Sequence, residues 1–347
     1  MATTYAIPDG RVAMAATTYT GTGATASISN AVNGVSFQPD FVWAKARSSA
    51  ESHRLEDSVR GATLALYSNL TNAEATEATG ITAFASNGFT LGSGTPNGSG
   101  ITYVGWQWKA GGTAVSNTAG SITSSVSANT TAGFSVVTYT GNGTSGATVG
   151  HGLGVAPSMV IAKNRSTGGT SAYEWTVYHV SLGATKALFL NDTGAAATDA
   201  GYWYNTAPTS SVVTVPSNTR TNVNGSNFVF YCFAPVAGYS AFGSYTGNGS
   251  ADGPFVYLGF RPRFIMIKKS SAAGDSWYMK DTSRSSYNVG LESLLADTSG
   301  AEGAGESWDA LSNGIKLRTT SSGVNTSGAT YIYMAFAENP FKYSLAR

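Results

Sequence analysis

The stretch Gly243–Lys268, GSYTGNGSADGPFVYLGFRPRFIMIK, decides the fold because its pattern occurs three times in the chain. Each copy has a Tyr-Thr-Gly-x-Gly turn, a variable link, and then a proline, an apolar run and a lysine. The copies are Tyr19–Gly23 with Pro39–Lys45, Tyr139–Gly143 with Pro157–Lys163, and Tyr245–Gly249 with Pro262–Lys268. Their tyrosines lie about 120 and about 106 residues apart, the size of a small domain. We therefore predict three tandem copies of one fold.

The composition favours strands and tight turns over helices. Charged residues make up 11% of the 347 residues, against roughly 25% in an ordinary soluble domain, and small or β-branched residues replace them. A hydrophobic content of 42% is ample for packed cores, and no window of about eleven residues has a clean helical period. We predict an all-β protein of three tandem antiparallel β-sandwich modules, of a jelly-roll or lectin-like kind.

The repeat also sets the predicted boundaries. They are an N-terminal arm at 1–16, module one at 17–109, a linker at 110–132, module two at 133–234 and module three at 235–347. The linker is rich in Gly, Ser, Thr and Ala, so we predict that it is flexible and that module one swings or docks separately. If the linker is instead captured as strands, Ile122 and Val126 are expected to be buried.

Charge and cysteine content narrow the class of protein. The net charge is +1 with no basic block, so no nucleic-acid partner is predicted. No apolar run approaches the roughly 18 residues of a membrane span, so no membrane insertion is predicted. The single cysteine, Cys232, excludes an intrachain disulfide framework. A protein that folds in a reducing cytoplasm and is later exposed outside fits this combination, and virus structural proteins are one such class.

Two pairs of opposite charges occupy corresponding places in the repeats. Module one has Asp57 with Arg60, module three has Asp281 with Arg284, and module two has His179 and Leu182 instead. Because an unpaired buried charge is costly, both members of a pair should be kept or lost together. We predict structural ion pairs that organise a turn.

Lysines end the three repeated apolar runs, at Lys45, Lys163 and Lys268. They could bind acidic sugars on a host surface. The favoured interpretation is that each lysine caps its strand and extends its ammonium group into solvent.

Neither a metal site nor a catalytic site is predicted, and no cofactor is expected. The histidines His53, His151 and His179 come without a metal-ligand spacing, although loop carboxylates leave calcium open. A glycosidase needs two carboxylates about 5–9 Å apart in one cleft. The acidic candidates lie in loops and do not recur between modules: Glu51 with Glu56, Glu74 with Glu77, and Glu302 with Glu306. We therefore predict a protein that is not an enzyme.

Most aromatic residues are expected to fill cores, with one exception. Tyr202, Trp203 and Tyr204 lie between stretches rich in Gly, Ala and Thr, and Trp308 lies in a comparable position. Exposed loop aromatics stack on sugar rings and anchor protein interfaces. We predict these four as the binding residues.

Several phrases of the chain also carry a resemblance to a known family. They are His151–Gly154, Pro157–Arg165, Trp175–His179, Tyr231–Ala234, Tyr245–Lys268, Ser312–Arg318 and Tyr331–Phe341. They resemble a bacteriophage domain family of unknown function, found as tandem modules in tail-fibre-like and other virion proteins. The match covers modules two and three well and module one more loosely, because His151 has no counterpart there. The family has no established catalytic residues, so the resemblance implies only a place in the virion, after synthesis in the host cytoplasm.

Two functions follow from these observations. The first is a tail fibre or host-contact appendage that binds cell-surface glycans through many weak contacts. The second is an architectural virion component, such as a capsid decoration or tail connector, with no receptor role. Either protein is expected to contact other virion proteins and to form a homo-oligomer, with a trimer favoured.

Overall fold

Each apolar run after a repeated proline forms a strand that is buried on both faces. These strands are β3 (Phe41–Ala46), β14 (Met159–Asn164) and β22 (Pro262–Lys269) in a computed structural model that describes residues 7–338. A strand covered on both faces has a continuous apolar run rather than an alternating one. Strands make up 43% of the structure and helices 4%, which confirms the predicted all-β class.

The same strand order recurs in three antiparallel sheets. We call residues 14–108, 134–233 and 240–337 repeats one, two and three. In each repeat the first strand pairs with the last, the last with the proline-led strand, and that strand with the next. The orders are β1 (Met14–Thr20)-β9 (Thr102–Trp108)-β3-β4 (Arg54–Asp57); β12 (Phe134–Thr140)-β19 (Asn227–Phe233)-β14-β15 (Thr176–His179); and β20 (Ser240–Thr246)-β27 (Thr330–Ala337)-β22-β23 (Trp277–Asp281).

One face of each main sheet packs against further strands of the same repeat. In repeat one these are β2 (Ala26–Ser29), β7 (Ile81–Ala85) and β8 (Gly88–Leu91), in repeat two β13 (Ala147–Gly150) and β18 (Val212–Val215), and in repeat three β21 (Phe255–Tyr257), β25 (Gly303–Leu311) and β26 (Gly314–Leu317). Val42 and Phe89, for example, belong to one buried cluster in repeat one. Further strands of the repeats are β5 (Leu64–Ala65), β6 (Ala75–Thr76), β16 (Lys186–Phe189), β17 (Ala197–Thr198) and β24 (Gly290–Leu295), and the α-helices are α1 (Ala200–Trp203) and α2 (Ser322–Asn325).

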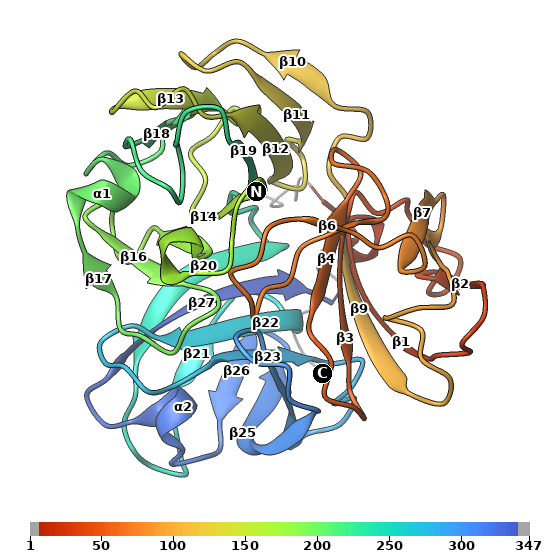
Figure 1. Cartoon of the computed structure of the whole chain (residues 1–347). Helices are drawn as coiled ribbons and strands as arrows, with labels where there is room; N and C mark the ends of the chain where they lie inside the picture. Colours follow the sequence, from red (N-terminus) through yellow and green to blue (C-terminus); the bar gives the residue numbers. More distant parts are fainter. Residues whose placement is uncertain (1–6, 339–347) are drawn as a thin grey trace.

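The other faces of the three main sheets meet in one shared core. Figure 1 shows the repeats as three lobes around a common centre, with repeat one at the right, repeat two at the upper left and repeat three below. At the centre lie Trp108, Phe233 and Phe336, one from the last strand of each repeat. Their ring centroids are 6.2, 5.7 and 5.8 Å apart. Repeat one is therefore packed against both other repeats, and the prediction that it swings or docks separately is wrong.

The predicted flexible linker is part of the sheet of repeat two. Residues 110–132 contain β10 (Val115–Asn117) and β11 (Ser124–Asn129), and β11 pairs with β12. Ile122 and Val126 are 6% and 3% exposed, so the alternative of capture as strands is the one found. Small residues let the segment approach closely: a Cβ on Gly120 would lie 2.3 Å from the Thr148 carbonyl oxygen.

The predicted N-terminal arm is also largely folded where it is described. Ile7 and Met14 are each 2% exposed in the shared core, and β1 begins at Met14 rather than after residue 16. Residues 1–6 of the arm, and the end of the Tyr331–Phe341 phrase, lie outside the described residues. No helix in the described part of the chain is long and apolar enough to cross a membrane.

Candidate functional site

The predicted binding residues Trp203 and Trp308 are buried, which corrects the expectation that they are exposed. Trp203 is 0% exposed because α1, capped by Asp199, turns its indole inward against Tyr178 and Phe230. Trp308 is 1% exposed because it lies in β25, not in a loop, and strand alternation points it into the core. Both tryptophans are core residues.

The two tyrosines beside Trp203 are only partly available. Tyr202 is half-buried, with its ring against Phe189 at 5.5 Å and the Arg220 guanidinium 5.9 Å from its centroid. Tyr204 is 46% exposed and ends α1 in the left-handed conformation. The four predicted residues therefore do not form one aromatic surface.

The three repeated lysines are buried, contrary to the expectation that they extend into solvent. Each ammonium group donates a hydrogen bond to a carbonyl oxygen of a different repeat. Lys163 of repeat two reaches Thr71 of repeat one at 3.1 Å. The other two bonds are Lys45 to Ser299 at 3.2 Å and Lys268 to Thr193 at 3.2 Å. We call these contacts the 2–1 seam, the 1–3 seam and the 3–2 seam, and together they close a ring.

A second hydrogen bond accompanies the lysine in each seam. The donor is the first residue of β4, β15 or β23, or the residue directly before that strand. Its ring nitrogen donates to a backbone carbonyl oxygen that lies a few residues before the carbonyl that accepts from the lysine. These bonds are Trp175 Nε1 to Tyr67 at 2.9 Å, Trp277 Nε1 to Phe189 at 2.8 Å and His53 Nε2 to Leu295 at 2.8 Å. The ring of seams therefore has the same geometry three times.

Burial changes the proton affinity of the seam lysines. It lowers the pKa of Lys163 to about 7 and, against nearby carboxylates, the pKa of Lys45 and of Lys268 to about 8 each. A buried lysine with such a pKa can serve as a base or nucleophile when substrate reaches it. Here each lysine is at most 1% exposed, so substrate does not reach it.

The predicted ion pairs are present and form part of larger networks. Arg284 Nε lies 2.6 Å from an Asp281 oxygen, and Arg60 pairs with Asp57 in the same way. Each arginine also reaches a glutamate that binds a second arginine across a seam. The sets are Asp57–Arg60–Glu74–Arg165 in the 2–1 seam and Asp281–Arg284–Glu302–Arg47 in the 1–3 seam. The burial of Glu74 alone would raise its pKa, but the two guanidinium groups outweigh this and lower it.

The 3–2 seam has none of these charges at the corresponding positions. His179 and Leu182 replace the aspartate and arginine, as the sequence shows. In the two charged seams the backbone N–H of the glutamate also donates to the backbone carbonyl of the second arginine, from Glu74 to Arg165 and from Glu302 to Arg47. In the 3–2 seam the Ala196 N–H donates to the Ser270 carbonyl in the same way, at 2.9 Å. Ala196 and Ser270 therefore replace the glutamate and the second arginine, and all four members differ together.

The other acidic candidates are also engaged by protein groups. Glu51 accepts from the Tyr103 hydroxyl, Glu77 from Tyr67, and Glu306 from Ser321 at 3.0 Å. Burial raises the pKa of Glu56 to about 7, only partly offset by nearby arginines, and this side chain is 0% exposed. In the described part of the chain, no group of three or more His, Cys, Asp or Glu side chains is placed to hold a metal ion.

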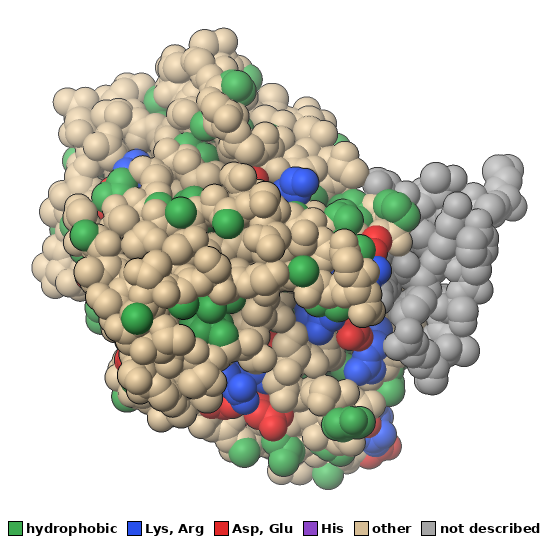
Figure 2. Space-filling view, turned by 90° about the vertical axis from the view of Figure 1, so that its right-hand side faces the viewer, with side chains coloured by type: hydrophobic (Ala, Val, Ile, Leu, Met, Phe, Trp, Pro, Cys, Tyr) green, Lys and Arg blue, Asp and Glu red, His purple; other side chains and the backbone are tan. Residues whose placement is uncertain are grey.

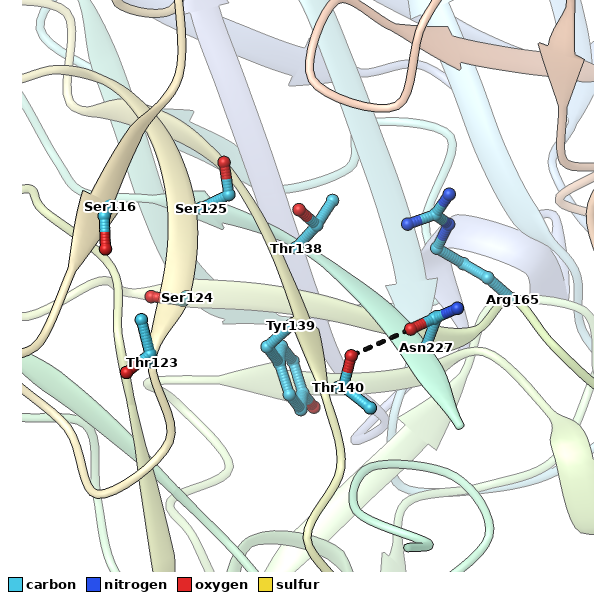
Figure 3. A pocket seen from close by; sticks show the side chains of 9 residues that line it. All are labelled: Ser116, Thr123, Ser124, Ser125, Thr138, Tyr139, Thr140, Arg165 and Asn227. Carbon is cyan, nitrogen blue, oxygen red and sulfur yellow. Dashed lines mark hydrogen bonds between the residues drawn. The ribbon is translucent and has the colours of Figure 1, made fainter. Parts of the chain in front are cut away.

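A polar groove with a volume of about 370 Å³ lies at the ends of β10, β11, β12 and β19 (Figure 3). Hydroxyl groups dominate its lining, which consists of Ser116, Thr123, Ser124, Ser125, Thr138, Tyr139, Thr140, Arg165 and Asn227. Ser125 and Thr138 are direct partners on adjacent strands. Thr140 donates to the Asn227 side chain at 2.9 Å, shown in Figure 3. Sequence reasoning missed this groove, because its residues come from the predicted linker, from β12 and β19, and from Arg165 just after β14.

The groove can bind a polar ligand but lacks a group for acid–base chemistry. Its one charged side chain, Arg165, already binds both oxygens of Glu74, at 2.9 and 2.8 Å. Tyr139 donates its hydroxyl to the Thr221 carbonyl and is 5% exposed. The hydroxyls of Ser125 and Thr138 make no hydrogen bond to the residues that the structure describes, so they remain available to a ligand.

Three exposed aromatics of repeat three were not predicted. Phe255 is 45%, Tyr257 64% and Tyr287 85% exposed. The sequence contained a signal for Phe255 and Tyr257. Successive side chains of a strand point to opposite faces, so only Val256 between them faces the core. Figure 2 shows the side turned by 90° from the view of Figure 1, where Lys and Arg side chains lie beside Asp and Glu in the lower half and hydrophobic side chains are scattered.

The chain belongs to a family described as a domain of unknown function, DUF7483, whose sequence model matches residues 12–340. The match includes all three repeats and the segment between repeats one and two. No curated protein matches the chain, and no solved structure does.

Proposed function

We propose that the chain is a non-enzymatic structural protein of a phage particle, and that it contacts the host by binding neutral glycans in the groove of repeat two. The observation that carries this proposal is the hydroxyl-lined groove, whose one guanidinium is neutralised by Glu74. The resemblance of the repeated phrases to phage virion domains supports the place in the particle. The architecture we propose is three tandem sandwich modules around one shared core, supported by the recurring strand order.

The groove chemistry favours a neutral sugar over an acidic one. Ser125 and Thr138 are side-by-side partners on adjacent strands, so their hydroxyls can pair with neighbouring hydroxyls of a sugar ring. An acidic sugar would need an unpaired cation, and the lysines first considered for this role are buried in the seams. Each such contact is weak, so useful attachment requires several copies, for which we propose a homo-oligomer, with a trimer favoured.

The test is binding of neutral oligosaccharides to the purified chain, first on a glycan array and then by titration. We expect Ser125→Ala with Thr138→Val to weaken binding at least about tenfold, which corresponds to about 1.4 kcal/mol. The matched control is Thr18→Val, at the corresponding exposed position in strand β1 of repeat one, which should bind as the parent does. If the double variant folds and binds unchanged, the groove is not the site.

An architectural role is the second candidate, and the exposed aromatics of repeat three favour it. Such residues anchor protein interfaces, whereas the buried Trp203 and Trp308 no longer support a receptor-binding loop. Particles carrying the groove variant decide between the two roles. Normal assembly with weaker adsorption to host cells supports host contact, whereas normal assembly with normal adsorption supports the architectural role.

A further inference from the structure

The chain covers one of its own sheet edges with an extended segment. Residues 120–122 lie along β13, where the Ile122 N–H donates to the Thr148 carbonyl at 2.9 Å. The Thr148 N–H in turn donates to the Ser121 hydroxyl oxygen at 2.9 Å, and the Ser121 N–H donates to the Thr148 hydroxyl oxygen at 2.8 Å. A parallel bridge joins Ile122 to Val149. The edge of the short sheet in repeat two is therefore satisfied by this segment.

The corresponding strand in repeat three, β21, has an uncovered edge. It is the last strand of its sheet, and only β26 pairs with it. Leu258 N–H donates to the Asn313 carbonyl at 2.9 Å, and alternation along an antiparallel ladder then directs the backbone groups of Phe255 and Tyr257 away from β26. Among the residues that the structure describes, no loop or strand hydrogen-bonds to these groups.

The side chains at this edge do not protect it. Natural edge strands are often blunted by charged side chains, especially lysine, or by proline. Repeat one has the small polar residues Ser27 and Ser29 at the positions where repeat three has the aromatic residues Phe255 and Tyr257. The Phe255 ring lies over Gly314, where a Cβ would be 3.1 Å from it, and remains 45% exposed. Lys316 on β26 is paired with Asp252 at 2.7 Å, so its charge does not repel a neighbour.

We propose that β21 binds an extended segment of a different polypeptide, in the way that β13 binds residues 120–122. The segment would run parallel to β21 and carry a serine or threonine followed by a β-branched apolar residue, as Ser121-Ile122 does. The hydroxyl would accept from the Phe255 N–H, and the exposed rings would pack on the segment. This interface is independent of the proposed groove, because it lies in another repeat and involves none of the groove residues.

The experiment is an NMR titration of the isotope-labelled chain with a synthetic peptide of residues 117–125, NTAGSITSS. We expect the amide signals of Phe255 and Tyr257 to shift, with a dissociation constant of about 1 mM, while those of Ser27 and Ser29 stay unchanged. Tyr257→Pro removes an edge N–H without touching the bonds to β26, and should weaken binding at least about tenfold. Phe255→Ser with Tyr257→Ser gives β21 the side chains of repeat one and should do the same.

Other outcomes overturn the proposal. Equal shifts at Ser27 and Ser29, or unchanged binding by the Tyr257→Pro variant, would show that the peptide does not recognise this edge. Self-association in sedimentation velocity that the same variant abolishes would assign the edge to a second copy of the chain. Shifts at Phe255 and Tyr257 produced by neutral oligosaccharides but not by the peptide would assign the rings to sugar.

Discussion

The 2–1 and 1–3 seams each contain a buried arginine–carboxylate network, whereas the 3–2 seam has uncharged side chains at the corresponding positions. All three share the lysine-to-carbonyl bond, at 3.1, 3.2 and 3.2 Å. The backbone geometry therefore does not depend on the charges. The charges differ between the seams as complete sets on a common frame.

This difference shows how a buried charge constrains its neighbours. Asp281 accepts from Arg284 and also from the Trp106 indole nitrogen at 3.0 Å, so it joins two repeats. Removing one member leaves the others buried without a partner, which costs more than the whole set contributes. In the 3–2 seam His179 instead donates to the Tyr333 carbonyl at 3.0 Å. A neutral hydrogen bond there replaces four coupled charges.

The largest effect is expected when one network loses a single member. Arg284→Leu leaves Asp281 buried without its guanidinium partner and Glu302 with Arg47 alone, and should lower the free energy of unfolding by about 3–5 kcal/mol. Urea denaturation measures this change. The matched control is Leu182→Met at the same position of the 3–2 seam, which should cost less than about 1.5 kcal/mol. A loss for Arg284→Leu no larger than the control would mean that the network adds nothing to the seam.

A paired exchange should recover part of that loss. Asp281→His together with Arg284→Leu installs the pair that repeat two has at His179 and Leu182. We expect the double variant to be about 1–3 kcal/mol more stable than Arg284→Leu alone, because it removes the unpaired carboxylate. The two single variants and the double variant, measured by urea denaturation, complete the cycle. Simple addition of the two single losses would contradict the idea of a coupled set.

Comparing one repeat with another in the sequence was enough to predict the all-β class and the buried ion pairs. The all-β class follows from the repeated apolar runs, and the ion pairs follow from the joint exchange of Asp57 and Arg60 for other residues in repeat two. These signals survive because the same strand order places them three times in the same surroundings. The exposed pair Phe255 and Tyr257 could have been found by the same comparison with Ser27 and Ser29.

Most of the errors concern contacts between distant parts of the chain. Lys45 was expected in solvent because its carbonyl partner, Ser299, lies 254 residues away. Residues 110–132 were expected to be a linker because their polar strands are recognisable only beside β12 and β13. Trp203 was expected in an exposed loop because only the fold shows that α1 turns it onto Phe230. Local composition does not contain this information.

Each seam contains one buried lysine, and these lysines should make the free energy of unfolding depend on pH above about pH 7. The pKa of Lys163 is about 7 in the folded chain, against 10.5 for an ordinary lysine, because of burial. Between these values the unfolded chain binds more protons, so the free energy of unfolding should rise with pH. Lys163→Met should reduce this slope by about 1 kcal/mol per pH unit, measured by denaturation between pH 7 and pH 10. Exposed Lys186→Met is the control, and equal slopes for Lys163→Met and the parent would contradict the assignment.

The smallest expected effect is at the neutral bond of the 3–2 seam. Burial lowers the pKa of His179 to about 4, against 6.5 for an ordinary histidine. At pH 7, His179→Leu loses one hydrogen bond to Tyr333 and should lower the free energy of unfolding by about 1 kcal/mol.

Between pH 6.5 and pH 4 the unfolded chain binds the additional proton, so the parent loses stability as pH falls and the variant is spared this loss. The difference between parent and His179→Leu should therefore narrow on acidification, whereas exposed Val180→Ala should follow the parent at every pH. A difference that stays constant from pH 7 to pH 4 would mean that His179 binds its proton equally well in the folded and unfolded chains, which would contradict the assignment.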